Sequence, residues 1–213
     1  MIRVRAPGPL TLGILASGRG SNFEAIADAI VKDKLHAKVA VVISDKEKAP
    51  VLEKAAYMNI PARFISPADF SNLDDYENEI VKILQAEKVD VVALAGYMRL
   101  IGKGFIEAFP YCVLNIHPAL LPSFRGLHAQ RQAIDAGVRF SGCTVHMVDE
   151  GMDTGPIVLQ AAVAIEADDD EDSLTRRILN EEHRIYWQAL QLYAEGRVYI
   201  DDKKRVIIVE DVR

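Results

Sequence analysis

The residues best suited to chemistry stand at the end of one apolar segment, Val113–His117, which Pro118 follows. Alternate side chains of a strand share a face, so Asn115 and His117 should lie side by side, about 6–7 Å apart along the strand. Pro118 has no amide hydrogen and should end the strand. An amide and an imidazolium can both donate to an oxygen that gains negative charge when an amine attacks a carbonyl group. We therefore hypothesise acyl transfer, against the alternative of a turn-capping asparagine beside a structural histidine.

A third partner should orient the histidine, and the loop at residues 149–156 offers several carboxylates after a strand-like run. Asp153 stands between Gly151 and Gly155, so it is our candidate. A carboxylate there would stabilise protonated His117 and relay a proton through water. The alternative is a solvated acidic hairpin. We interpret His146 as a structural strand residue, and the remaining histidines show no clear local signal: His36, His128 and His183.

A glycine-rich loop, residues 17–22, separates the first predicted strand from the first predicted helix. Glycine lets a backbone approach a ligand closely, and the free N–H groups of a helix N-terminus attract phosphate. Ser21 or Asn22 could cap the helix. The loop therefore predicts a monophosphate site with Gly20, Ser21 and Asn22 as donors.

Two other interpretations of this loop stay open. It can be a bare strand-to-helix turn. It can also begin a dinucleotide site, because Gly18 and Gly20 start that fingerprint and Asp45 ends the second predicted strand where a ribose-binding acid would stand. Phe23 occupies the third glycine position of that motif and disfavours it. No Gly-Lys-Ser/Thr follows, which excludes a nucleoside-triphosphate P-loop.

Composition restricts the class of protein. The chain has 213 residues, half of them apolar, and a net charge of −6, so we expect one domain over residues 1–213 and no nucleic-acid partner. It shows no apolar run of membrane length and no signal peptide, so we expect a cytoplasmic protein. Cys112 and Cys143 stand in apolar runs and should be reduced and buried. No residue spacing suggests a metal site.

The surrounding elements alternate between strand and helix through the first half of the chain. Strands are predicted at 10–16, 39–43, 62–65, 89–95 and 111–116, and helices from 22, at 49–58, at 75–87 and at 173–194. This order is typical of an α/β fold with an open, mostly parallel, twisted sheet and helices on both faces. Strands at 143–148 and 157–165 should pair antiparallel at one edge, and 198–209 should form a hairpin.

Five motifs occur in order, at residues 17–22, 94–100, 115–122, 126–128 and 149–155. Together they resemble the phosphoribosylglycinamide formyltransferase family over residues 12–193. The resemblance implies a single-domain, Rossmann-like fold. It also implies transfer of the formyl group of 10-formyltetrahydrofolate to the amine of glycinamide ribonucleotide, by a monomer or homodimer without metal.

The resemblance also implies roles for single residues. The ribonucleotide phosphate would bind Gly20, Ser21 and Asn22, and the catalytic trio would be Asn115, His117 and Asp153. Folate would contact Asn115 and two further sets: Met98, Arg99, Leu100 and Ile101 in the pterin pocket, and Asp149, Glu150, Gly151, Met152 and Asp153 in the acidic loop. Glu182 would lie near the glycinamide end of the substrate. The Leu121–Pro122 bond would be cis.

Two positions depart from the family pattern. Leu73 stands where some members have an arginine that meets the folate glutamate tail, so tail recognition should be weaker or come from elsewhere. Arg125 stands where some relatives have proline, and it is either a phosphate contact or an exposed turn residue.

Four rival functions fit the sequence less well. A formyltetrahydrofolate hydrolase needs no phosphate loop, and a methionyl-tRNA formyltransferase would need a basic surface. A non-catalytic sensor has no use for an oxyanion site, and a dehydrogenase conflicts with Phe23.

Overall fold

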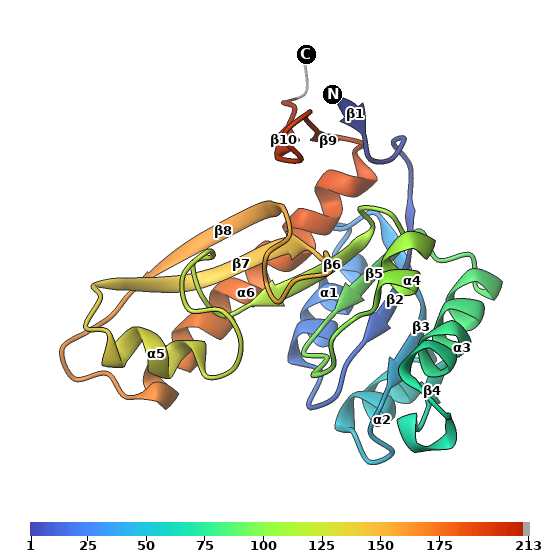
Figure 1. Cartoon of the computed structure of the whole chain (residues 1–213), viewed down its shortest axis with the longest axis horizontal. Helices are drawn as coiled ribbons and strands as arrows, with labels where there is room; N and C mark the ends of the chain where they lie inside the picture. The colour runs from blue at the N-terminus through green and yellow to red at the C-terminus, as the bar shows by residue number, and fades with distance from the viewer. Residues whose placement is uncertain (211–213) are drawn as a thin grey trace.

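A seven-stranded sheet forms the centre of the computed structural model, which describes residues 1–210 (Figure 1). The strand order is β4-β3-β2-β5-β6-β7-β8, parallel from β4 to β6, with β7 and β8 antiparallel at one edge. The strand bounds are β2 Leu10–Leu15, β3 Ala37–Ser44, β4 Ala62–Phe64, β5 Val91–Leu94, β6 Val113–His117, β7 Phe140–Met147 and β8 Ile157–Ala164. The predicted fold class is confirmed, antiparallel edge included.

Helices cover both faces of the sheet because its central strands are apolar on both sides. The helices are α1 Ser21–Val31, α2 Pro50–Tyr57, α3 Leu73–Ala86, α4 Lys103–Ala108, α5 Ala129–Asp135 and α6 Glu171–Ala194, with a 3₁₀ turn η1 at Pro67–Asp69. One apolar cluster joins the sheet to α1, α2 and α6, and a second joins it to α3 and α4. Figure 1 shows α3 and α4 on the β2–β4 side of the molecule, away from β7 and β8.

A second, three-stranded sheet forms from the two ends of the described chain. β9 (Val198–Ile200) pairs antiparallel with β10 (Val206–Ile208), which confirms the predicted hairpin. β9 also pairs with β1 (Ile2–Arg3), a strand that we did not predict. Residues 211–213 of the expected single domain lie outside the described residues.

Two local expectations need correction. Helix α1 begins at Ser21, and its N-cap is Gly20 in the left-handed conformation without a side-chain cap. Ser21 and Asn22 therefore lie inside the first turn and do not cap it. Cys143 is buried and free as expected, but Cys112, also free, is partly exposed because it precedes β6.

The chain order places a crevice at the carboxyl edge of the sheet. From β2 the chain moves to β3 and β4 on one side, then returns to β5 and β6 on the other. Loops that leave β2 and β5 at this edge diverge, and open α/β sheets bind ligands at such a switch point. Within residues 1–210 no helix is long and apolar enough to cross a membrane.

Candidate active site

The pairing of β6 with β7 brings four polar side chains onto one face of the sheet. Asn115 lies opposite His146, and His117 lies opposite Thr144. The residues between them, Ile116 and Val145, belong to the apolar cluster under α6. The four polar side chains therefore point to the other face, at the carboxyl end of β6.

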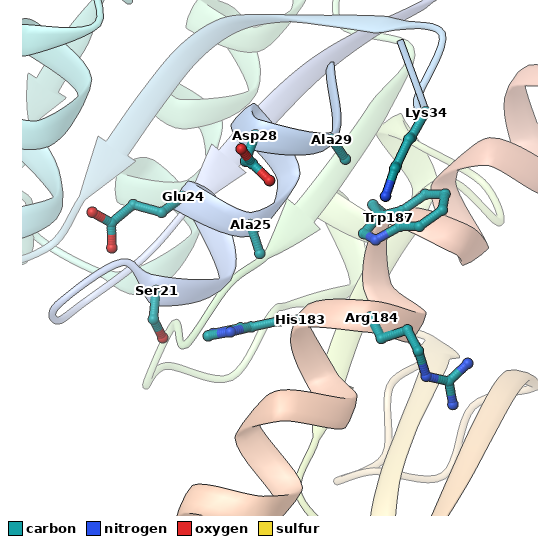
Figure 2. Close-up of a pocket in the computed structure, with 9 residues that line it drawn as sticks. All are labelled: Ser21, Glu24, Ala25, Asp28, Ala29, Lys34, His183, Arg184 and Trp187. Carbon is teal, nitrogen blue, oxygen red and sulfur yellow. The ribbon is translucent and has the colours of Figure 1, made fainter. Parts of the chain in front are cut away.

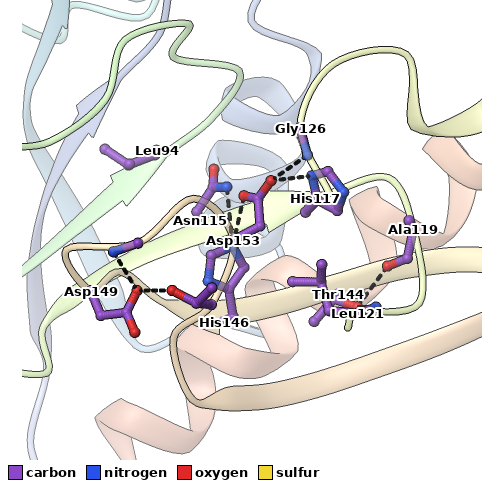
Figure 3. A network of polar contacts seen from close by, with 12 residues as sticks. Leu94, Asn115, His117, Ala119, Leu121, Gly126, Thr144, His146, Asp149 and Asp153 are labelled. Carbon is purple, nitrogen blue, oxygen red and sulfur yellow. Dashed lines mark hydrogen bonds and ion pairs between the residues drawn. The ribbon is translucent and has the colours of Figure 1, made fainter. Parts of the chain in front are cut away.

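The imidazole of His117 is buried and holds a partner at each nitrogen (Figure 3). Its Nε2 donates to the main-chain carbonyl of Phe124 at 2.8 Å. Its Nδ1 lies 3.4 Å from Asp153 Oδ2. Because a carbonyl only accepts, Nε2 carries a proton, and a second proton on Nδ1 would face the carboxylate.

Two opposing effects set the protonation of His117. Burial lowers the pKa of His117, while the Phe124 carbonyl and Asp153 raise it without fully offsetting burial. The free protein therefore favours the neutral ring near neutral pH. A negative charge that develops beside the ring would draw the second proton onto it.

Asp153 is held between two histidines and a main-chain amide. Gly126 N–H donates to Oδ2 at 2.9 Å, and His146 Nε2 lies 3.6 Å from Oδ1. Burial by itself would raise the pKa of Asp153, but the contacts from His146, Gly126 and His117 outweigh it and lower that pKa to about 2. The carboxylate is therefore ionised at neutral pH.

His146 lies inside strand β7, as expected, and it also contacts two of the predicted catalytic side chains, Asn115 and Asp153. Its Nδ1 donates to the Met147 carbonyl at 2.9 Å, and its Nε2 lies 3.2 Å from Asn115 Nδ2. When neutral, Nε2 accepts from Asn115; when protonated, it donates to Asp153. Period-two spacing already put Thr144 and His146 on one face, but their positions opposite His117 and Asn115 depend on strand register.

A buried threonine shapes the turn that follows β6. Thr144 Oγ1 donates to the Ala119 carbonyl at 2.7 Å and accepts from Leu121 N–H at 3.1 Å. Gln160 Nε2 lies 3.0 Å from the same hydroxyl. The Leu121–Pro122 bond in this turn is cis, as the resemblance implied. The turn fixes the path from His117 towards Phe124, whose carbonyl accepts from that histidine.

The glycine-rich loop has the geometry of an anion site at the start of α1. Gly20 has a φ of 75°, and a Cβ there would lie 2.5 Å from Val51 Cγ2, so the position requires glycine. The N–H groups of the first turn, at Ser21 and Asn22, have no main-chain acceptor within residues 1–210. They are free to bind a phosphate.

The side chain of Asn22 does not cap helix α1, as we had expected it to, but bonds to a residue of α6. It is buried, and its Nδ2 donates to Glu182 Oε2 on α6 at 2.8 Å. Burial raises the pKa of Glu182 to about 7, although the Asn22 bond opposes the shift. The main-chain N–H of Asn22 is the group that this arrangement leaves for a phosphate at the start of α1.

The segment predicted to line the pterin, residues 98–101, is called the pterin strip here. It is mostly exposed and offers free main-chain groups. Met98 and Leu100 are 69% and 64% exposed, whereas Ile101 is buried. Residues 99–101 make no main-chain hydrogen bond to any other residue in the described part of the chain. The guanidinium of Arg99 lies 5.4 Å from the Tyr76 ring centroid.

Both ends of the strip are anchored. Met98 N–H donates to Ser17 Oγ at 2.9 Å, which ties the strip to the glycine-rich loop. Gly102 N–H donates to Glu77 Oε1 at 2.8 Å. The strip therefore presents apolar side chains and unpaired main-chain groups from a fixed backbone, as a flat heterocycle requires.

The acidic loop is folded by its own side chains. Asp149 Oδ1 accepts from Thr154 Oγ1 at 2.6 Å and from Gly151 N–H at 3.1 Å. Met152 is 52% exposed, and Asp153 has a φ of 53°. The loop thus directs Asp153 inward while Glu150 and Met152 remain at the surface.

The predicted residues form two groups and not one. Asn115, His117 and Asp153 come together, with His146 added. Gly20, Ser21, Asn22 and Glu182 form the second group, and no hydrogen bond or ion pair joins the two within residues 1–210. Both lie at the carboxyl edge of the sheet, one after β6 and one after β2.

The two departures from the family pattern lie at the surface. Leu73 is the first residue of α3 and is 42% exposed. Arg125 is exposed, and its carbonyl accepts from Gln132. Within the described chain, no three His, Cys, Asp or Glu side chains gather as a metal site would need.

Comparison with known proteins gives the class of this fold and site. The family model described as formyl transferase matches residues 11–190. The chain therefore belongs to the formyl transferase family.

Particular members of this family are close to the chain. It is 43% identical over 173 residues to the phosphoribosylglycinamide formyltransferase of Bacillus subtilis, covering 81% of the chain and 89% of that protein. The solved structure of glycinamide ribonucleotide transformylase 1 from Symbiobacterium toebii is 47% identical, with a TM-score of 0.92 over 94% of each chain.

A longer relative matches the chain over only a small part of the relative's own length. The chain is 45% identical over 192 residues to the trifunctional purine biosynthetic protein adenosine-3 of Drosophila melanogaster. That match covers 89% of this chain and 14% of the fly protein, so the chain spans about one seventh of it.

Proposed function

We propose that the chain transfers the formyl group of 10-formyltetrahydrofolate to the amino group of glycinamide ribonucleotide, a step of purine biosynthesis. The observation that carries the proposal is the cluster of Asn115, His117 and Asp153 at the same sheet edge as a phosphate-binding turn. The similarity to enzymes named for this reaction supports it.

The ribonucleotide binds at the start of α1. Its phosphate accepts from the main-chain N–H groups of Ser21 and Asn22, and Gly20 lets it approach. Glu182, held by Asn22, lies on the side of the substrate that carries the glycinamide. This placement leads the amine towards the end of β6.

The folate binds along the exposed strip after β5. The main-chain groups of Met98, Arg99, Leu100 and Ile101 line the pterin, and the side chains of Met98 and Leu100 cover it. The acidic loop closes the other side with Asp149, Glu150, Gly151, Met152 and Asp153. The formyl carbon then lies beside Asn115 and His117.

The reaction is direct attack by the unprotonated amine on the formyl carbon. A bond from the amine nitrogen to that carbon forms, and electrons move onto the formyl oxygen, where Asn115 and protonated His117 donate to it. His117 has to leave either the Phe124 carbonyl or Asp153 to do so, because both of its nitrogens hold partners in the free protein.

The intermediate then collapses and the bond to folate N10 breaks. One proton moves from the attacking nitrogen to N10, through a water held by Asp153 and His117. The products are the formylated amine and tetrahydrofolate, and no covalent bond to the protein forms. We further propose that the enzyme acts in the cytoplasm as a monomer or homodimer on these small molecules, without nucleic acid.

One assay separates this function from its rivals. The purified protein is mixed with 10-formyltetrahydrofolate, with and without glycinamide ribonucleotide, and folate absorbance is followed. We expect release of tetrahydrofolate only when the ribonucleotide is present. Release without the amine would indicate a hydrolase, and no release in either mixture would reject formyl transfer from this donor.

A further inference from the structure

A groove of about 510 Å³ runs between α1 and α6 and begins at the phosphate-binding turn (Figure 2). Ser21 lies at one end of it, and Trp187 lies at the other end with the Lys34 ammonium 6.0 Å from its ring centroid. The groove is separate from the Asn115 cluster. Only its Ser21 end belongs to the site described above.

His183 lies in the wall of this groove, directly after Glu182 on α6. Figure 2 shows its ring directed towards Ser21, while the neighbouring Arg184 points away. Its Nε2 is enclosed without a hydrogen-bond partner, and no residue from 1 to 210 bonds to either ring nitrogen. By contrast, His117 and His146 each have partners at both nitrogens.

Three of the charged groups that line the groove are already paired with other residues, whereas the Lys34 ammonium lies over the Trp187 ring. Glu24 on α1 binds Lys54 at 2.7 Å, and Asp28 binds Lys32 at 2.8 Å. Arg184 on α6 binds Glu181. Burial lowers the pKa of His183, with Glu24 opposing the shift, so the ring favours the neutral form in the free protein.

We propose that His183 positions the ribonucleotide phosphate by taking a proton from solvent and donating to a phosphate oxygen bound at Ser21. In this proposal the ring turns about Cβ–Cγ so that a nitrogen faces the groove, because Nε2 is enclosed in the free protein. The phosphate dianion stabilises the imidazolium, so binding takes up one proton. This inference rests on the proposed function for the identity of the ligand.

The test uses His183→Gln, which removes the charge, and His183→Lys, which keeps one. Steady-state kinetics with glycinamide ribonucleotide are measured from pH 6 to 8.5. We expect His183→Gln to raise KM about tenfold at pH 6, the size typical of a lost charge-assisted hydrogen bond, with kcat within about twofold. The KM ratio to wild type should shrink towards pH 8.5, where the wild-type ring is also neutral. His183→Lys should keep KM low throughout.

Controls separate contact with phosphate from a structural role. Arg184→Gln, at the adjacent and exposed position, should leave KM unchanged. Binding of the dephosphorylated glycinamide riboside should not respond to His183→Gln. An unchanged KM in His183→Gln, an equal loss of riboside affinity, or a pH-independent ratio would each overturn the proposal, and thermal unfolding confirms that the variants are folded.

Trp187, the single tryptophan of the chain, lines the groove and reports binding by fluorescence without turnover. If wild type binds the ribonucleotide more tightly than His183→Gln but transfers no formyl group, only the proposed reaction fails. If wild type transfers formyl groups and His183→Gln has the same KM, only the role of His183 fails.

Discussion

The carboxylate of Asp153 lies 3.4 Å from Nδ1 of His117, although the two residues come from different elements. This contact exists because β7 pairs with β6, and because the loop after β7 folds back across the carboxyl end of β6. This contact is therefore a product of sheet register and loop geometry together.

Replacing Asp153 by asparagine should keep the loop shape and remove the charge that favours protonated His117. We expect Asp153→Asn to lower kcat by about 10²-fold, in the range typical of assisted proton transfer. Steady-state kinetics at saturating folate test this. Asp135→Asn, which removes an exposed carboxylate paired with Arg131, is the control and should turn over normally. A kcat for Asp153→Asn within about twofold of wild type would exclude the carboxylate from catalysis.

Glu182 should make the fold less stable as pH rises. Its pKa is about 7 in the folded protein against an ordinary 4.5. Between these values the folded state holds one more proton than the unfolded state, so stability falls as pH increases through this window. The full shift corresponds to about 3 kcal/mol.

Glu182→Gln keeps an acceptor for Asn22 and removes the buried charge. We expect it to be more stable than wild type by up to about 3 kcal/mol at pH 8 and nearly equal at pH 5, measured by urea unfolding. Its affinity for glycinamide ribonucleotide should nevertheless fall. A stability difference that is the same at both pH values would show that Glu182 is not a buried, strained acid.

Thr144 should support the turn after β6 through its hydroxyl. Thr144→Val keeps the side-chain shape but removes the hydroxyl that bonds both the Ala119 carbonyl and Leu121 N–H, which then retain only their 3.2 Å bond to each other. We expect a loss of about 2 kcal/mol in unfolding free energy. Turnover should also fall, because the turn sets the position of His117. Thr144→Ser retains the hydroxyl and should stay within about 1 kcal/mol of wild type. Equal stability of the two variants would argue against the hydroxyl.

Much of the sheet could be predicted from sequence because its central strands are apolar runs. Elements that lack such a pattern were missed. Helices α4 and α5 have 6 and 7 residues, too few for a helical period to be visible. Strand β1 has two residues, and its partner β9 lies at the far end of the chain, so no local signal marks it.

The site was predicted where local patterns reach and missed where packing decides. Period-two spacing placed Asn115 and His117 together, and flanking glycines pointed to Asp153. The contact of His146 with Asn115 was not predicted, because it depends on the register between β6 and β7. The bond from Asn22 to Glu182 arises from the packing of α1 on α6, which a linear sequence does not display.

The central claim is that Asn115 and His117 act on one carbonyl oxygen, and a double-mutant cycle on formyl transfer tests it most directly. Asn115→Ala and His117→Ala should each lower kcat by about 10²–10³-fold. Together they should lower it by clearly less than the product of the single losses, because groups that act as a unit are not additive. Losses that multiply fully, or near-normal turnover in either single variant, would contradict the account.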